Sequence, residues 1–389
     1  MTSIPSPVTW AQAATRRMSR QFLAGPTGPT PAAATAAMLG AHAQVLSAAE
    51  LSVALRTADA TRADVRAALW EDRSLVKTYG PRGTVHLLPA ADLPLWTGAL
   101  SALPAGPQPL PPDVRMSTAQ TDEVVAAIGD ALAGAELTVD ELTDAIVART
   151  GPWAGERVMD AFQDKWPRWR QMTHTAAHRG VLCFGPNRGR NVTYTSPGVR
   201  PDEGTRALAA LVERYLYAYG PATPQHFAKW LAAPAGWAGT LFTTLAGEGR
   251  IEEVAFEDTR AWVVAGDTEF PAGPARGVRL LPYFDAFTIA SQPRERLFPG
   301  AAWGRALSRG QAGNYPVLLV DGTVAGVWHQ RRSGRRIAIT VEPLTPPTPA
   351  TRLNAARTRQ LEAEAERVAA ILEGTAELTV GTVTVGPHA

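Results

Sequence analysis

The sequence has little cysteine and no long hydrophobic run, and each absence excludes a class of protein. Cys183 is the single cysteine among 389 residues, which excludes an internal disulfide framework and a cysteine-based zinc site. No run of about 18 consecutive apolar residues is present, so we expect no membrane span. The first residues lack the basic and then apolar layout of a secretory signal. We therefore expect a soluble cytoplasmic protein.

The chain also lacks a strong excess of either charge. Lys and Arg number 38 against 36 Asp and Glu, which gives a formal net charge of +2. A role on nucleic acid therefore requires that the positive charge be clustered. We find no Walker loop, dinucleotide fingerprint, metal-spaced cluster or nucleophile elbow, so we expect neither a cofactor nor a metal.

The clearest feature of the sequence is an internal repeat, in which the same order of predicted helices and strands occurs three times. Each copy has a helix, a second helix behind a capping residue, a third helix, and two strands joined by a polar turn. The predicted caps are Ser47, Thr138 and Thr223, and the hairpins cover residues 74–88, 181–194 and 251–264. The interval from cap to strand is equal in the first and third copies and longer in the second, where an extra element fits.

This plan is typical of a helix-turn-helix followed by a β-wing. We therefore predict an α+β fold with three tandem winged-helix domains and a C-terminal β-rich part that ends in a helix. The expected domains are residues 1–100, 101–200, 201–268 and 269–389. Winged helices bind DNA, but they also serve as protein-interaction modules, so the layout by itself leaves both roles open.

From Arg276 onward the pattern changes to strands, including the stretch 278–287. A predicted hairpin from Trp328 to Ile337 turns at Ser333-Gly334. Its end carries His329 and Gln330 followed by four arginines within six residues, namely Arg331, Arg332, Arg335 and Arg336. Such a tip can neutralise phosphates or enter a narrow groove, although a solvated turn is the simpler alternative. Residues 352–372 form an amphipathic helix that we expect to pack on the sheet.

Several short segments, in their joint order, carry a family resemblance over nearly the whole chain. They are 39–44 (LGAHAQ), 82–86 (RGTVH), 281–285 (LPYFD), 320–322 (VDG) and 326–328 (GVW). The chain resembles the AlkZ-like and YcaQ-like bacterial DNA glycosylases. The resemblance implies tandem winged helices around a DNA channel, with the C-terminal hairpin as a DNA-probing element. It also implies removal of bulky N7-alkylated purines, in DNA repair or in self-resistance to a genotoxic natural product.

The resemblance places the catalytic motif at His42, Ala43 and Gln44, where the first position has histidine in place of the usual glutamine. In an extended segment, side chains two residues apart share a face, so both can reach one site. Because an N7-alkylated purine is already a good leaving group, the remaining task is to stabilise a cationic sugar and place a water. Gln44 can orient that water, and His42 can accept its proton or hydrogen-bond it.

The other candidate DNA contacts are Arg82 in the first hairpin turn and Arg188 and Arg190 in the second. We expect Asp285 and His86 to be structural and to hold strands in register. The leading hypothesis is a monofunctional glycosylase that acts as a monomer on double-stranded DNA containing an alkylated purine. The alternative is a non-catalytic winged-helix transcriptional regulator, and a protein-interaction scaffold is a third possibility.

Overall fold

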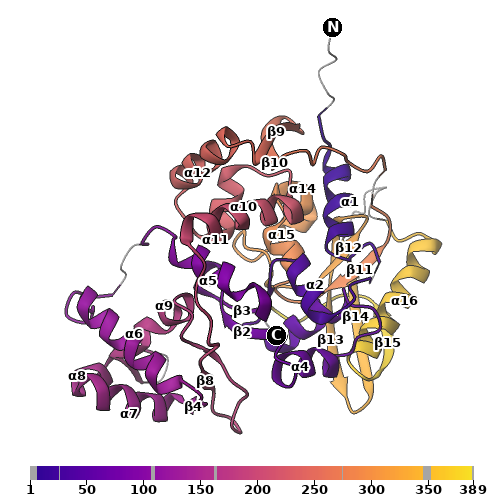
Figure 1. The fold of residues 1–389 in the computed structure, drawn as a ribbon. Coiled ribbons are helices and arrows are strands. Elements are labelled where there is room, and N and C mark those ends of the chain that lie inside the picture. Colours follow the sequence, from indigo (N-terminus) through magenta and orange to yellow (C-terminus); the bar gives the residue numbers. More distant parts are fainter. Residues whose placement is uncertain are drawn as a thin grey trace. The chain divides into compact units, whose positions relative to one another are not determined.

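The structure is a computed structural model that describes residues 7–25, 27–106, 110–161, 164–273, 275–344 and 352–387. The chain divides into two compact units (Figure 1). Unit 1 contains Met1–Glu71 and Val212–Ala389, and unit 2 contains Asp72–Leu211. Within the described residues, no helix combines the length and the apolar character that a membrane crossing requires.

Unit 1 is built on a five-stranded sheet in the order β11-β12-β13-β14-β15. Neighbouring strands are antiparallel except β14 and β15, which are parallel. The strands are β11 (Val278–Leu281), β12 (Val317–Val320), β13 (Thr323–Ser333), β14 (Arg336–Pro343) and β15 (Thr375–Val380). A separate antiparallel pair consists of β9 (Ile251–Phe256) and β10 (Thr259–Val264).

The helices of unit 1 precede the strands of this sheet or lie between them in the chain. They are α1 (Trp10–Arg20), α2 (Pro31–Ala37), α3 (Leu46–Ala54), α4 (Arg62–Trp70), α11 (Pro224–Leu231), α12 (Ala235–Gly247), α13 (Ala286–Ala290), α14 (Arg294–Leu297), α15 (Ala301–Ala306) and α16 (Ala355–Ile371). The main core joins the sheet to α1, α13, α14 and α15 through buried residues such as Met18, Phe287, Leu297 and Val327. The long helix α16 packs on β11 and β15, as its amphipathic pattern predicts (Figure 1).

Unit 2 has its own core, centred on the fully buried Trp169. Its helices are α5 (Leu93–Ser101), α6 (Thr118–Leu132), α7 (Val139–Thr150), α8 (Pro152–Gly155) and α9 (Thr173–His178). Its strands are β2 (Leu75–Tyr79), β3 (Val85–Pro89), β4 (Leu137–Thr138), β5 (Arg157–Asp160), β6 (Lys165–Pro167), β7 (Cys183–Phe184) and β8 (Thr193–Thr195). The short hairpin β5–β6 occupies the interval that the sequence left for an extra element. Helix α10 (Gly204–Tyr219) contains the second boundary between the units.

The mixed α+β class is confirmed, and two of the three predicted second-helix caps are correct. Thr138 and Thr223 each accept a hydrogen bond from the third residue of their helix, α7 and α11 respectively. All three predicted hairpins form. The arrangement of these elements as tandem winged helices, and the four domain boundaries, remain predictions.

The predicted cap at Ser47 is wrong. Helix α3 begins at Leu46, so its N-cap residue is Val45, two residues before Ser47, and Val45 has no capping side chain. Glu50 does not reach back to the backbone because its buried carboxylate forms ion pairs with Arg62 and Arg66 instead.

A further difference lies at the end of a strand. The pattern of 278–287 predicted strand throughout, but the strand stops at Leu281, and Asp285 caps helix α13 by accepting the backbone N–H of Phe287 at 2.9 Å. Helix α1 and strand β15 were not anticipated.

Candidate functional site

The candidate site is a cavity of about 190 Å³ in unit 1, formed by segments distant in sequence. Its wall begins with the amino end of α3 and continues to β13. The described lining residues are Val45, Ser47, Ala48, Leu51, Arg62, Pro282, Tyr283, Pro316, Trp328, His329, Gln330 and Leu372. The cavity thus brings residues of the predicted DNA-probing hairpin beside the segment that follows the predicted catalytic motif.

A tight turn sets the path of that motif. Gly40 has φ +92°, a conformation that favours glycine because a Cβ is strained there, and its N–H bonds the Thr35 carbonyl at 2.9 Å. The chain then enters the extended segment β1 (Ala41–His42). His42 is only 6 % exposed, and its ring stacks on Phe284 with centroids 4.6 Å apart. Gln44 lies in the following bend and is exposed. Convergence of the two side chains on one reacting centre remains a prediction.

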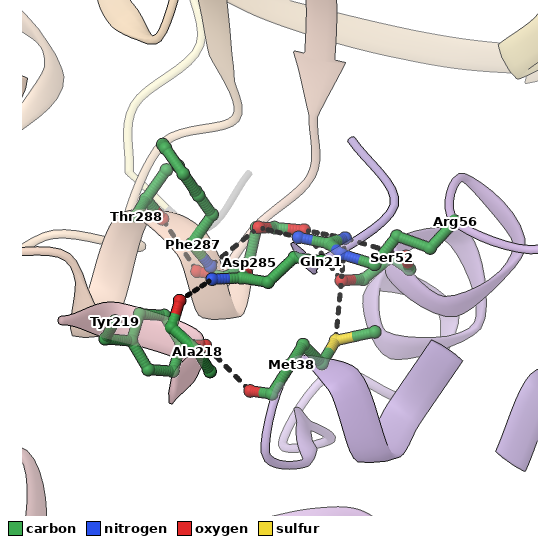
Figure 2. Close-up of polar contacts among 9 residues, drawn as sticks. All are labelled: Gln21, Met38, Ser52, Arg56, Ala218, Tyr219, Asp285, Phe287 and Thr288. Atoms are coloured by element: carbon green, nitrogen blue, oxygen red, sulfur yellow. Dashed lines mark hydrogen bonds and ion pairs between the residues drawn. The ribbon is translucent and has the colours of Figure 1, made fainter. Parts of the chain in front are cut away.

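The loop that carries Phe284 is fixed by a buried ion pair to Arg56, two residues after the end of α3 (Figure 2). Both nitrogens of the Arg56 fork donate to the Asp285 carboxylate at 2.8 Å, and the Ser52 hydroxyl lies 2.7 Å from the same carboxylate. All three side chains are buried. Nearby, the Tyr219 hydroxyl donates to the Met38 carbonyl at 2.7 Å, next to the Gly40 turn. These contacts fix the segments on both sides of the His42 ring.

Asp285 is therefore structural, as expected, although it does not hold strands in register. It connects the start of α13 to Arg56, just after α3, across 229 residues of sequence. His86 lies within β3 opposite Thr78, so its place in a strand pair agrees with the expectation.

Two features give the cavity positive charge: the amino end of α3 and the side chain of Arg62. The first amides of α3 have no side-chain cap, and a helix start has partial positive charge. Arg62, at the start of α4, lines the same cavity and donates its Nε to Glu50 at 2.8 Å.

Strand β13 contributes the opposite wall and is anchored there by Trp328. This ring is 1 % exposed, and its Nε1 donates to the Leu281 carbonyl at 2.9 Å. The next residue, His329, is half-buried, and burial lowers its pKa, so the ring is neutral near pH 7. The buried Oε1 of Gln330 has no hydrogen-bond partner among the described residues, so it can accept a hydrogen bond from a group that enters the cavity.

The four arginines at the β13–β14 tip are all exposed, but they divide into two kinds. Arg332 donates to the Leu372 carbonyl at 2.9 Å, and Arg336 pairs with Glu377 of β15. For Arg331 and Arg335, the described residues offer no ion pair. The latter two are therefore the tip cations most available to an external anion.

The three candidates outside the hairpin and the motif all lie in unit 2. Arg82 occupies the turn between β2 and β3, with φ +62°, and is half-buried. Arg188 is engaged by Glu141, whose carboxyl pKa the guanidinium lowers to about 2. Arg190 is exposed on the same turn. Because Glu141 neutralises Arg188, Arg190 is the more available cation of this pair.

Sequence reasoning missed Arg62, Tyr283 and Phe284 as members of the site. The segment 281–285 was recognised as a motif, and an aromatic pair directly before Asp285 could have indicated a ring packing on the histidine. Arg62 gave no signal, because a lone arginine at the start of a helix resembles many solvated ones.

Comparisons with known proteins identify the family. The sequence profile of the family described as DNA glycosylase AlkZ-like matches residues 35–371. An interstrand DNA cross-link repair glycosylase of Streptomyces sahachiroi is 32% identical over 348 residues, which cover 82% of this chain and 87% of that protein. The solved structure of the Streptomyces sahachiroi DNA glycosylase AlkZ superposes with a TM-score of 0.79 at 28% identity. That match covers 97% of this chain and 100% of the other.

Proposed function

The chain belongs to the AlkZ-like family of DNA glycosylases, and from this premise we propose that it hydrolyses the N-glycosidic bond of N7-alkylated purines in double-stranded DNA. We include bulky adducts and interstrand cross-links, because the similar Streptomyces sahachiroi protein is named for cross-link repair. The proposed role is DNA repair or self-resistance to a DNA-alkylating natural product, performed by a monomer.

The observation that carries the proposal is the cavity beside the motif. Neither His42 nor Gln44 is among the described residues that line it, but it joins the residues directly after Gln44 to His329 and Gln330 of the hairpin. A DNA segment contacted by β13 would therefore lie beside the end of the motif. The unpartnered Gln330 Oε1 supports a ligand with hydrogen-bond donors at this position.

The proposed chemistry needs little acid catalysis, because alkylation at N7 already gives the purine a positive charge. As the glycosidic bond breaks, positive charge develops on the sugar, and the Gln44 amide oxygen stabilises it and orients a water. His42 accepts the proton of that water or hydrogen-bonds it, with its ring plane fixed by the stack on Phe284. Water adds at C1′, and the purine leaves with the electron pair of the broken bond.

We propose a monofunctional reaction, without strand cleavage by β-elimination. A bifunctional enzyme uses an amine nucleophile that forms a Schiff base with the sugar. None of the chain's three lysines, Lys77, Lys165 and Lys229, is among the described residues that line the cavity.

The test is base release from duplex DNA carrying N7-methylguanine or a bulky N7 adduct, followed by alkali to reveal abasic sites. Wild-type protein should generate abasic sites, and strands should break only after alkali. Breaks that appear without alkali would contradict the monofunctional mechanism.

The alternative of a non-catalytic regulator is not favoured, because the family and the similar proteins are DNA glycosylases. A regulator would bind one undamaged sequence tightly and release no base. The scaffold alternative predicts no salt-dependent DNA binding at all.

A further inference from the structure

Two arginines share one buried carboxylate at the edge of the candidate cavity. The Glu50 side chain is 1% exposed. Arg62 donates its Nε to this carboxylate at 2.8 Å, and Arg66 donates its Nε at 2.7 Å and an Nη at 3.2 Å. Two guanidinium charges against one carboxylate leave the trio with a net charge of +1.

The two arginines differ in where they lie. Arg66 uses two groups on Glu50, is 52% exposed, and is not among the lining residues of the cavity. Arg62 uses only its Nε, is 18% exposed, and lines the cavity. Its two Nη groups have no hydrogen-bond partner among the described residues. Neither Nη group is among the buried atoms that lack a partner, so both are accessible to an anion that enters the cavity.

The surroundings of Arg62 favour an anion. None of the described residues that line the cavity is acidic. Val45 and Ser47 bring the uncapped amino end of α3 to the same wall, which adds partial positive charge. His329 is neutral near pH 7 because burial lowers its pKa, so it neither competes for an anion nor repels the guanidinium.

We propose that Arg62 binds a phosphate of the DNA backbone at this cavity, with Glu50 as the residue that orients it. With Nε engaged by Glu50, the two Nη groups form a fork that matches two phosphate oxygens. This contact holds the strand beside the hairpin residues His329 and Gln330. It rests on the proposed function, since it assigns a backbone contact to the same site.

The test compares Arg62→Ala with Arg66→Ala as a matched control, because each variant removes one partner of Glu50 and leaves the other. Affinity is measured over a salt series on two undamaged duplexes of unrelated sequence. For Arg62→Ala we expect binding weaker on the order of tenfold on both duplexes, and a salt slope reduced by about 0.9. Arg66→Ala should keep the wild-type slope, because this side chain does not line the cavity and its two hydrogen bonds are both with Glu50.

Arg62→Gln serves as a second variant, since its amide can still donate to Glu50 and preserve the fold. It should show the same loss of slope with a melting temperature close to that of wild type. Unchanged slopes in both Arg62 variants would overturn the proposal. A loss that depends on sequence, at unchanged slope, would also overturn it, because it would identify a contact to a base edge. Wild-type base release is a separate measurement, so failure of the proposed function is distinguishable from failure of the phosphate contact.

Discussion

The Arg56–Asp285 pair is the residue-scale feature on which the site geometry depends most. Both side chains are fully buried, so neither charge has water as a substitute partner. We expect Asp285→Asn to lower the free energy of unfolding by about 3–5 kcal/mol, because it leaves a buried guanidinium without its counter-charge. Chemical denaturation of the variant and of wild type measures this difference.

The matched control for that variant is Glu253→Gln. It breaks an equivalent arginine–carboxylate fork, with Arg260, that lies on the surface. The expected cost is below about 1 kcal/mol, since water replaces an exposed partner. Equal destabilisation of the two variants would contradict the view that the buried pair fixes the loop that carries Phe284.

At the scale of elements, the β13–β14 hairpin carries two arginines that bond other described residues and two that form no ion pair with them. Arg331→Ala with Arg335→Ala should weaken DNA binding and lower the salt slope by about 2, one phosphate for each cation. Arg332→Ala with Arg336→Ala should change the slope less, because these side chains already bond Leu372 and Glu377. Binding measured over a salt series distinguishes the pairs. Equal effects would mean that the tip acts only through its total charge.

Helix α11 carries a pH-sensitive cap. The Nδ1 of His226 accepts the Thr223 N–H at 3.2 Å, and burial, with the charges of Arg17 and Lys229, lowers the histidine pKa to about 4. As the pH falls, the histidine of the unfolded chain therefore takes up a proton before that of the folded chain. The contribution of His226 to the free energy of unfolding is fully present above the ordinary pKa near 6.5 and decreases as the pH falls from there toward 4. The expected loss is up to about 3 kcal/mol.

His226→Gln tests this dependence, because the glutamine oxygen can accept the same bond without titrating. Denaturation midpoints at pH 7.5 and pH 4.5 should differ less for the variant than for wild type. The same difference in both proteins would show that other groups, such as the half-buried His178 of unit 2, account for the acid sensitivity.

For the whole molecule, short sequence motifs predicted most helices and strands correctly, but they did not predict contacts between distant segments. Thr138 and Thr223 were identifiable as caps because a capping bond spans only three residues. Ser47 failed because Glu50 found partners 12 and 16 residues later. The cavity was not predictable for the same reason, since its walls come from α3, the loop before Asp285 and β13.

The candidate site was predicted in part. The motif at His42 and Gln44 was identified through family resemblance, and the hairpin through its clustered arginines. The stack on Phe284 and the orientation of Arg62 depend on which distant segments pack together, and no periodic pattern encodes that. Arg188 illustrates the reverse case: a cation that looked available in the sequence is engaged by Glu141.

The most direct test of the central claim is base release by wild type and by the His42→Ala, Gln44→Ala double variant. Both proteins are incubated with duplex DNA carrying a bulky N7 purine adduct, and abasic sites are counted after alkali. Wild type should release the base, and the double variant should lose most of this activity while still binding DNA and keeping its melting temperature. Equal base release by the two proteins, or none by wild type above the level of the variant, would contradict the account.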